Sequence, residues 1–409
     1  MIIAGGTYTE TVIEPDSKDL MGSGMRAAAA LAPHDNSLRL VTAVDDAMAE
    51  EAELVSEALG VRRTLVERSE PVGFRYMTPI SSPLINGVGA IASGGVREEA
   101  DTALLFGFVE RGEVLTSVDA RTVVLDPQKP RDTDRLNLSS IQSERLVLVA
   151  NRSETRQLAR GEGSVAAAAR KLLSDPRLDA VVTKQGAAGS LVSWRSGTEI
   201  HQQTVGAHPT NRVWPIGSGD AFSAGYAFAL QQGADYVEAA RVGSRSAAHW
   251  CSTRQPSLPV AVLAGEDVSD ALRPRRARVY VAGPFFTTGE RWLVETVRDQ
   301  LDSLGVIPWS PVHEVGHGEN IAHADLAGLR SSDAVLALLD HSDSGTIFEV
   351  GWAVAAQIPV VGFGRVVEKE GMKMLGGSSV ELHRDLATAC YRAAWAAMGL
   401  SIEPGWMTT

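Results

Sequence analysis

The chain has 409 residues, which is too long for one ordinary domain and long enough for two. Hydrophobic residues make up 44% and charged residues 22%, a profile typical of soluble globular proteins. The net charge of -12 argues against a nucleic-acid scaffold, because phosphate binding relies on clustered Lys and Arg, but it leaves nucleotide substrates open.

The two cysteines, Cys251 and Cys390, lie far apart without metal-ligand spacing, which favours small buried side chains in a reducing compartment. The first residues lack a basic region with a long apolar run, and no stretch is long and apolar enough to span a bilayer. We therefore expect a cytoplasmic protein that binds neither membranes nor nucleic acid.

In the first 262 residues, short apolar runs alternate with amphipathic segments, which is the pattern of an α/β domain. The predicted strands cover residues 38–44, 102–108, 122–125, 146–150 and 180–183, and the predicted helices cover 164–173, 220–231 and 237–251. Residues 252–278 contain three prolines and a basic run, so we predict a linker over 263–277 with a short docking strand at 260–263 before it.

A second, smaller α/β unit is predicted over residues 278–400, with a tail over 401–409. Its expected elements are a strand from 278, a helix over 290–304, a loop over 310–318, a helix over 320–330, a strand over 334–339, an acidic turn over 340–345, a helix over 347–357 and a strand over 359–363.

Residues 215–222 read Pro-Ile-Gly-Ser-Gly-Asp-Ala-Phe and lead into an apolar helix. The glycines let backbone N–H groups approach an anion closely, and the helix N-terminus favours negative charge. Asp220 is not needed to bind phosphate, but it suits a general base that takes a proton from a substrate hydroxyl during phosphoryl transfer. An ordinary helix cap is the alternative, because Asp and Gly are common there.

Other landmarks fall in order along this half: Glu10 after the first strand, the Gly-rich segment Gly22-Ser23-Gly24-Met25-Arg26, the N-x-x-E motif from Asn151 to Glu154, and the turn Thr183-Lys184-Gln185-Gly186-Ala187-Ala188-Gly189. With Gly217 to Asp220, they resemble the PfkB/ribokinase family of sugar and nucleoside kinases over residues 1–262. The resemblance implies a ribokinase-like three-layer α/β/α fold and a reaction with ATP and Mg²⁺. It implies Asp220 as catalytic base and Glu154 as an indirect Mg²⁺ contact. The other implied positions are Glu10, Gly22, Gly24 and Arg26 for the substrate, and Asn151, Glu154, Thr183, Gly186, Gly189, Gly217, Ser218 and Gly219 for the nucleotide.

This half departs from the family pattern at two places. Arg26 stands where the family has Asn, and Trp214-Pro215-Ile216 replaces an acid-Thr-Thr lead-in. The first departure argues against ribose itself as acceptor. Arg26 either pairs with a phosphate or carboxylate on the substrate or lies on the surface.

In the C-terminal half, Glu349 lies at the start of an apolar helix, directly after a strand and a Gly-containing turn. This is the usual ligand position in an open α/β sheet, and the helix dipole is expected to lower the pKa of Glu349 and keep it anionic. Cleavage of an N-glycosidic bond needs one group for the sugar cation and one for the leaving base. Candidate partners are Asp325, Asp333, Asp340 and Asp343. For Asp340, Asp343 and Glu349, solvated turn and capping roles are the alternative.

With Tyr280-Val281-Ala282-Gly283-Pro284-Phe285-Phe286, these acids resemble the nucleoside 2-deoxyribosyltransferase family and its related N-hydrolases over residues 278–365. The resemblance implies a Rossmann/flavodoxin-like doubly wound domain and, from family habit, a homo-oligomer. It implies Glu349 as nucleophile, Asp325 as base-side acid and Asp343 as the contact to the sugar 5′ end. Tyr280 would place the nucleophile, and Gly283, Pro284 and Phe285 would line the base pocket. Because a carboxylate repels a 5′-phosphate, Asp343 favours an unphosphorylated nucleoside.

The histidines near residue 315 do not have the spacing of a zinc helix. For His313, His317 and His323, beside Glu314 and Glu319, we favour a loop lining the base pocket over a metal site. Trp309 is expected to pack in the core, with base stacking as the alternative.

The sequence thus predicts a bifunctional enzyme of nucleoside or ribosyl metabolism. One domain cleaves or transfers a (deoxy)ribosyl group, the other phosphorylates a sugar or nucleoside hydroxyl with ATP and Mg²⁺, and Asp343 favours cleavage as the first step. Two alternatives stay open: a nucleotide or nucleoside sensor with a catalytically degenerate kinase-like domain, and an NAD or nucleotide N-glycohydrolase.

Overall fold

The structure is a computed structural model that describes residues 1–128, 138, 140–161, 163–266, 269–316, 321–341, 343–366 and 369–406. The chain divides into two compact units. Unit 1 comprises Met1–Lys184, Gly189–Val205 and Pro215–Val268, and unit 2 comprises Gln185–Ala188, Gly206–Trp214 and Ser269–Thr409. Across the described ranges, no helix is long and apolar enough to cross a membrane.

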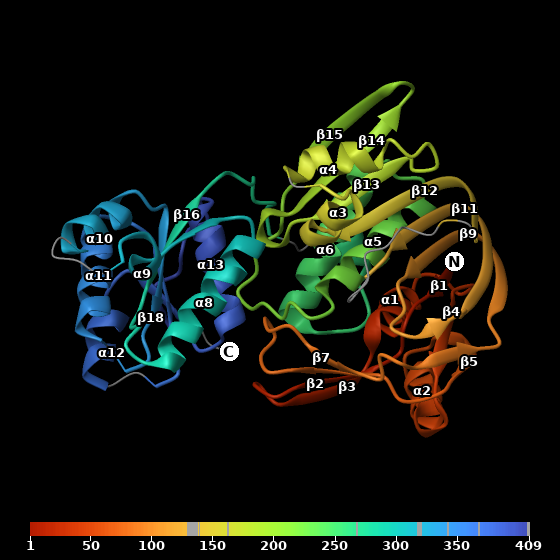
Figure 1. Cartoon of the computed structure of the whole chain (residues 1–409), viewed down its shortest axis with the longest axis horizontal. Helices are drawn as coiled ribbons and strands as arrows, with labels where there is room; N and C mark the ends of the chain where they lie inside the picture. Colours follow the sequence, from red (N-terminus) through yellow and green to blue (C-terminus); the bar gives the residue numbers. More distant parts are fainter. Residues whose placement is uncertain are drawn as a thin grey trace. The chain divides into compact units, whose positions relative to one another are not determined.

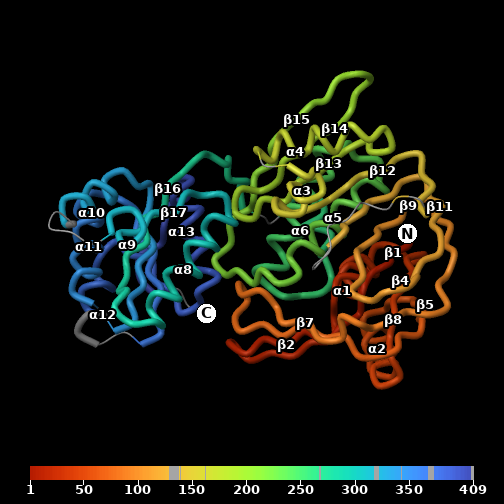
Figure 2. Tube along the Cα trace, in the orientation of Figure 1, coloured from red at the N-terminus to blue at the C-terminus, as the bar shows by residue number. Residues whose placement is uncertain are grey.

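Unit 1 is built on an 11-stranded sheet in the order β10-β8-β5-β4-β1-β9-β11-β12-β13-β14-β15. The strands from β5 to β13 in this order run parallel, and β14 and β15 add an antiparallel edge. Figure 2 shows β1 between β4 and β9, which come from different parts of the chain. The bounds are β1 Ile2–Ala4, β4 Arg39–Val44, β5 Arg62–Arg68, β8 Ile91–Ser93, β9 Val96–Phe106, β10 Arg111–Gly112, β11 Leu115–Asp126, β12 Ile141–Asn151, β13 Ala180–Lys184, β14 Ser190–Ser196 and β15 Glu199–Val205.

Helices cover both faces of this sheet, because alternate strand side chains enter two separate apolar cores. Val147 and Val149 enter the core shared with helices α1, α5 and α6, whereas Leu146 and Leu148 enter the core on the other face, with α3 and α4 (Figure 1). The helices are α1 Gly22–Leu31, α2 Asp46–Ala58, α3 Arg152–Leu158, α4 Val165–Leu172, α5 Ser218–Gln231, α6 Tyr236–Thr253 and α7 Val260–Ala264.

A separate four-stranded sheet in unit 1 follows the order β3-β2-β6-β7. Its strands are β2 Thr9–Val12, β3 Ser17–Leu20, β6 Gly73–Tyr76 and β7 Leu84–Asn86. It carries Glu10 on β2 and Tyr76 on β6, which matter for the site described below.

The docking strand predicted at residues 260–263 is wrong, because this segment forms the short helix α7. Val262 is buried in the core, and Arg245 donates from Nε to the carbonyl of Val262 at 3.1 Å and from Nη2 to that of Leu263 at 3.0 Å. These bonds satisfy carbonyls that a helix end leaves without partners, and Gly265 closes the helix in the left-handed conformation. A β-branched run therefore became helical through tertiary contacts.

Unit 2 holds a six-stranded parallel sheet in the order β17-β16-β18-β19-β20-β21. Tyr280 and Ala282 of β16 face the core with α10 and α11, and α8 and α13 lie across the sheet from these helices (Figure 1). The strands are β16 Arg278–Ala282, β17 Ile307–Trp309, β18 Ala334–Leu338, β19 Val360–Phe363, β20 Val380–His383 and β21 Gly405–Trp406. The helices are α8 Thr288–Ser303, α9 Pro311–Glu314, α10 Ile321–Arg330, α11 Ser344–Ala355, α12 Lys369–Gly376 and α13 Leu386–Ala397, and the 3-10 turn η1 covers Gly186–Ala188. A layered α/β unit followed by a smaller α/β unit confirms the predicted fold class.

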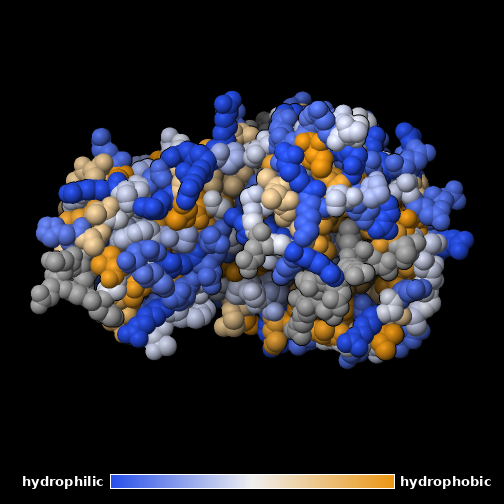
Figure 3. Space-filling view, turned by 45° about the horizontal axis from the view of Figure 1, so that its top comes forward, coloured by the Kyte–Doolittle hydropathy of each residue, from blue (hydrophilic) through white to orange (hydrophobic). Residues whose placement is uncertain are grey.

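On the face shown in Figure 3, apolar surface is broken into small patches separated by polar side chains. Single exposed apolar residues are normal in folded proteins. Among the described residues, large exposed ones include Met77, Phe286, Trp292, Phe348 and Met374.

Candidate active sites

Glu349 lies inside helix α11, after the turn that follows strand β18. The helix begins at Ser344, three residues before the predicted start, because Asp343 caps it: its Oδ2 accepts the N–H of Thr346 at 2.9 Å and the Thr346 hydroxyl at 3.1 Å. Glu349 is therefore beyond the first helical turn, where the dipole acts most strongly.

The expected lowering of the pKa of Glu349 is wrong. Burial raises the pKa of Glu349 to about 7, and the nearby carboxylates of Asp325 and Asp343 add to the rise. Desolvation penalises the charged form of an acid, and here its effect on the pKa is larger than that of the helix dipole. Near neutral pH, Glu349 is thus poised between its two protonation states.

The Tyr280 hydroxyl holds the Glu349 carboxylate, donating to Oε1 at 2.5 Å. Tyr280 is fully buried in strand β16, and its ring stacks on Trp309 with centroids 4.9 Å apart. Trp309 in turn lies against Gly328, where an added Cβ would come within 2.3 Å of the indole. Trp309 therefore packs behind the tyrosine, and it fixes the hydroxyl that orients Glu349.

Asp325 on α10 brings a second acid to the same place. Its Oδ1 is buried and has no hydrogen-bond partner among the residues that the structure describes, and burial raises the pKa of Asp325. Its charge also acts on both Tyr280 and Glu349. A buried acceptor without a partner is costly in a folded protein and often marks a ligand position.

The loop after β16 carries Gly283, Pro284 and Phe285. An added Cβ on Gly283 would lie 2.9 Å from Cβ of Leu338, so the loop start packs directly on β18. The ring of Phe285 stacks on exposed Phe286 at 5.5 Å, and the Arg291 guanidinium binds the carbonyls of both. This ordered loop presents aromatic surface at the carboxyl end of β16.

Other acids and histidines of this unit have structural partners. Asp340 accepts the N–H groups of Arg365 and Val366 at 2.6 and 2.7 Å, and His313 bonds Ser310 and Glu295, each at 2.7 Å. His317 and Glu319 lie outside the described residues. In the part of the chain that the structure describes, no group of three His, Cys, Asp or Glu is arranged to hold a metal ion.

In unit 1, the Arg26 guanidinium joins the two acids expected to meet the acceptor. Nη1 donates to Asp220 Oδ2 and Nη2 to Glu10 Oε2, each at 2.5 Å. Arg26 is 2% exposed, so the surface position considered from the sequence is wrong. Glu10 Oε1 also accepts the N–H of Gly22 at 3.1 Å, and burial raises the pKa of Glu10.

Three more residues enclose this ion pair. The Arg26 guanidinium lies 4.8 Å from the centroid of the Trp250 ring, and Gln128 donates from Nε2 to Asp220 Oδ1. Tyr76, from the small sheet, lies close enough that burial first, and then the charge of Glu10, raise the pKa of its hydroxyl.

Gly217 lets Arg26 reach this position. It has a φ of +82°, and an added Cβ would lie 2.2 Å from Arg26 Nε. The first turn of α1 is equally close-packed, because Gly22 and Gly24 lie directly on the backbone of Gly5 and Gly6. The glycines of both motifs therefore leave room for neighbouring groups to pack directly against the backbone.

Beside the N-terminus of α5, Lys184 forms a second charged group. Its Nζ donates to Asp126 Oδ2 at 2.6 Å and lies 3.2 Å from the position of a Cβ added to Gly219. Ser223 donates to the same Asp126 oxygen at 2.7 Å, whereas buried Asp126 Oδ1 has no hydrogen-bond partner in the described part of the chain. A cation, bare glycine N–H groups and a helix N-terminus form an arrangement suited to phosphate.

The N-x-x-E motif forms a capping box at the start of α3. Asn151 Oδ1 accepts the N–H of Glu154, and Glu154 Oε2 accepts the N–H of Asn151, both at 2.8 Å. Burial and the charge of Asp126 raise the pKa of Glu154, so these two acids are neighbours. Thr183 bonds the hydroxyl of Thr155 at 3.1 Å.

The remaining predicted positions have local roles. The Ser218 hydroxyl donates to the carbonyl of Pro215 at 2.8 Å, and Gly189 has a φ of +79° before β14. Gly186 belongs to unit 2, where an added Cβ would lie 2.9 Å from Leu304.

Sequence reasoning missed Asp126, Gln128, Lys184, Trp250 and Tyr76. The signal for Asp126 was an acid at the carboxyl end of a strand, and Lys184 lies inside the turn motif already noted.

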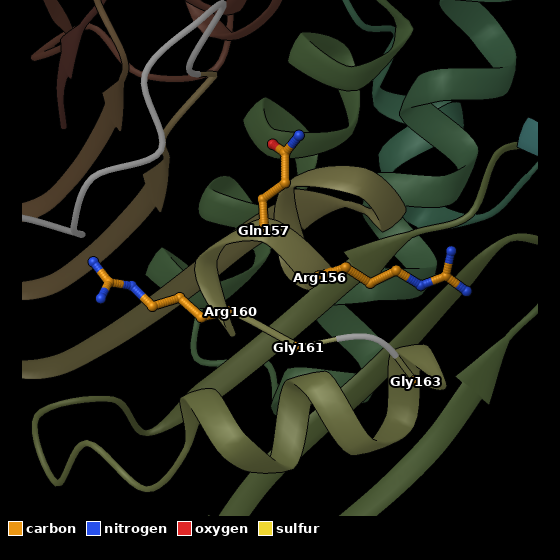
Figure 4. Close-up of a pocket in the computed structure, with 5 residues that line it drawn as sticks. All are labelled: Arg156, Gln157, Arg160, Gly161 and Gly163. Carbon is orange, nitrogen blue, oxygen red and sulfur yellow. The ribbon is translucent and has the colours of Figure 1, made fainter.

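A pocket of about 680 Å³ next to α3 is lined by Arg156, Gln157, Arg160, Gly161 and Gly163. Figure 4 shows the side chains of Arg156 and Arg160 extending in opposite directions. The pocket therefore does not bring two cations onto one ligand, and it is separate from the residues above.

Two family models match the chain. Residues 114–261 match the pfkB family carbohydrate kinase, and residues 279–381 match the nucleoside 2-deoxyribosyltransferase. The chain joins a segment similar to pfkB kinases to a segment similar to deoxyribosyltransferases. Both resemblances predicted from the sequence are confirmed, in the same order. Asp220 and Glu349 fall inside the matches, whereas Glu10 and Arg26 lie before the first one.

Among solved structures, a ribokinase from Cryptococcus neoformans var. grubii serotype A in complex with ADP has 15% identity and a TM-score of 0.48, covering 64% of this chain and 97% of its own. The tetrameric inhibited form of phosphofructokinase-2 from Escherichia coli has 16% identity and a TM-score of 0.47, covering 64% and 98%. The Arabidopsis thaliana ribokinase complexed with ribose and ATP has 16% identity and a TM-score of 0.43, covering 64% and 97%. A search of curated proteins found no match.

Proposed function

We propose that unit 2 cleaves or transfers the glycosyl group of a nucleoside or similar N-riboside through a covalent ester on Glu349. One observation carries the proposal: Tyr280 holds Glu349 at 2.5 Å, in the same site as the buried, unpartnered Oδ1 of Asp325. A positioned carboxylate and a second acid are the two groups that this chemistry needs.

In the proposed reaction, a carboxylate oxygen of Glu349 bonds to the anomeric carbon as the carbon–nitrogen bond breaks. The electron pair of that bond goes to the base nitrogen, which takes a proton from Asp325. Water or a second base then attacks the same carbon and gives its proton to Asp325, and Glu349 leaves as a carboxylate. Asp343 Oδ2 serves the helix cap, and the half-buried carboxylate would accept a hydrogen bond from a free 5′-hydroxyl with its other oxygen.

We further propose that unit 1 uses ATP and Mg²⁺ to phosphorylate a hydroxyl of a sugar or nucleoside. The N-terminus of α5 and Lys184 support a phosphate position, and unpartnered Asp126 Oδ1 beside Glu154 suits Mg²⁺, which neutralises phosphate charge when bound. Asp220 then takes the proton of the acceptor hydroxyl.

The decisive experiment incubates a nucleoside library with the full chain, with and without Mg-ATP, and identifies the products by mass spectrometry. Glu349→Gln abolishes glycoside cleavage, and full cleavage by this variant would reject the nucleophile. Asp220→Asn abolishes phosphorylation and leaves cleavage intact, because the two acids belong to different units. Loss of both activities in one variant contradicts separate sites.

A second candidate is a nucleotide sensor with a catalytically degenerate kinase-like unit. The ion pair between Arg26 and Asp220 favours it, because it engages the proposed base. Calorimetric ATP binding without phosphate transfer to any acceptor would support the sensor.

A further inference from the structure

The Arg26 cluster decides which acceptors can approach Asp220. One guanidinium binds both acids, with 2.5 Å to Asp220 Oδ2 and 2.5 Å to Glu10 Oε2. The other oxygen of each acid also has a donor, Gln128 for Asp220 and the N–H of Gly22 for Glu10. An acceptor hydroxyl must therefore compete with a charge-assisted hydrogen bond for Asp220.

A neutral acceptor that takes Asp220 leaves Arg26 with Glu10 alone. Arg26 is 2% exposed, its Nε has no hydrogen-bond partner within the described ranges, and Trp250 covers the face of its guanidinium. Losing the bond to Asp220 is unfavourable, because the freed Nη1 donor, like Nε, is buried and cannot reach water.

An acceptor with its own anionic group avoids this loss. Its carboxylate or phosphate takes the Nη1 edge of Arg26 as its hydroxyl takes Asp220 Oδ2. Arg26 then keeps two anionic partners, and Asp220 keeps hydrogen bonds from Gln128 and from the acceptor hydroxyl. Guanidinium groups suit both anions, because their fork of N–H donors matches carboxylate and phosphate oxygens.

We propose that Arg26 is a specificity-determining residue that selects acceptors carrying a carboxylate or a phosphate in addition to the hydroxyl that is phosphorylated. This inference rests on the proposed kinase function of unit 1. In the transfer step, the acceptor O–H proton passes to Asp220, the new O–P bond forms, and the bond from the γ-phosphorus to the bridging oxygen breaks to release ADP. Arg26 stays bound to Glu10 and the acceptor anion throughout.

The inference also bears on how the two activities connect. A free sugar released by unit 2 has no anionic group, so it is not the direct acceptor of unit 1. A reaction that adds a phosphate or oxidises the sugar to an acid must come between them, or unit 1 acts on a separate anionic substrate.

The test compares matched acceptors with the full chain and Mg-ATP: a pentose, its aldonate and its monophosphate. ADP formation gives kcat/KM, and mass spectrometry identifies the product. We expect the aldonate, the monophosphate or both to exceed the pentose on the order of 100-fold, as the loss of a buried partner implies. The two anionic arms distinguish a carboxylate from a phosphate.

The variants Arg26→Lys and Arg26→Met should reduce this preference by about tenfold or more, because neither offers a two-pronged donor. Arg68→Lys is the matched control: Arg68 is equally buried and also bridges two acids, Asp45 and Glu110, at 2.7 Å each. It should keep the preference. Glycoside cleavage by unit 2 and thermal unfolding report whether each variant is folded.

Equal kcat/KM for neutral and anionic acceptors overturns the selectivity and leaves the kinase function standing. Faster transfer to the neutral pentose by Arg26→Met, with the anionic acceptors unchanged, also overturns it, because Arg26 then only obstructs the site. If the wild type forms no ADP with any acceptor class, the proposed kinase function and this inference both fail.

Discussion

The hydrogen bond from Tyr280 to Glu349 gives a sharp test of the proposed nucleophile. Tyr280→Phe removes the hydroxyl and keeps the ring that stacks on Trp309 at 4.9 Å. The bond lowers the pKa of Glu349, which burial raises to about 7. A hydrogen bond to a charged group is worth about 1.5–3 kcal/mol, so its loss raises the pKa by roughly 1–2 units.

A higher pKa of Glu349 should lower the rate at neutral pH, because only the ionised carboxylate is the nucleophile. At pH 7 about half of the wild-type Glu349 is ionised, against roughly 1–10% in the variant, so kcat/KM falls about 5- to 50-fold at pH 7, and the midpoint of its rise with pH moves up by the same 1–2 units. The assay is a pH profile of kcat/KM for nucleoside cleavage. Tyr226→Phe is the control, because the buried Tyr226 hydroxyl has no hydrogen-bond partner among the described residues. A loss of rate with an unmoved pH midpoint would refute the reasoning.

Three further predictions follow from single contacts. Asp325→Asn should slow the cleavage of nucleosides with natural bases by about 10²–10⁴-fold. Cleavage of a nitrophenyl riboside should slow much less, because its leaving group needs no proton. Equal losses in the initial rates on the two substrates would contradict a proton donor at Asp325. Gly217→Ala should destabilise unit 1 more than Gly94→Ala in urea unfolding. Both glycines have φ near +80°, but only at Gly217 would the added Cβ lie 2.2 Å from Arg26. Similar losses of unfolding free energy in the two variants would mean that only the backbone conformation matters. Bound arginine and histidine groups oppose burial and lower the pKa of Glu381 from 4.5 to about 2. This stabilisation, roughly 3 kcal/mol, is complete above pH 4.5 and lost as the pH falls toward 2. Glu381→Gln should flatten the pH dependence of unfolding between these values, and an unchanged slope would place the acid sensitivity elsewhere.

The buried parts of the fold were readable from the sequence, whereas its edges were not. Residues 146–150 read as a strand because they are apolar throughout, and both faces of this segment are buried in β12. The outer parts of β9 and β12 carry exposed polar residues, such as Arg97 and Glu144. These residues interrupt the alternation of apolar and polar side chains that indicates a strand. Strand pairing with neighbours fixed these ends, and such pairing is not a local property.

The candidate sites were found where chemistry follows a local pattern. Asp220 and Glu349 each lie in an apolar helix that follows a turn, so the sequence alone points to them. Their partners were not readable in the same way. Arg26 and Asp220 are 194 positions apart, and Tyr280 and Glu349 are 69 apart. The state of Glu349 also depends on burial, which only tertiary packing sets.

The two proposed sites differ in how the reacting acid is held, and this predicts different dependence on substrate chemistry. Glu349 is held by the neutral hydroxyl of Tyr280, which can keep its bond to one oxygen as the other attacks. Asp220 is held by a buried guanidinium, which releases an acid readily only when another anion replaces it. Cleavage should therefore proceed on neutral nucleosides without ATP, whereas phosphoryl transfer should require an anionic acceptor. A chain that phosphorylates neutral sugars but cleaves only anionic ribosides would reverse this assignment of the two sites.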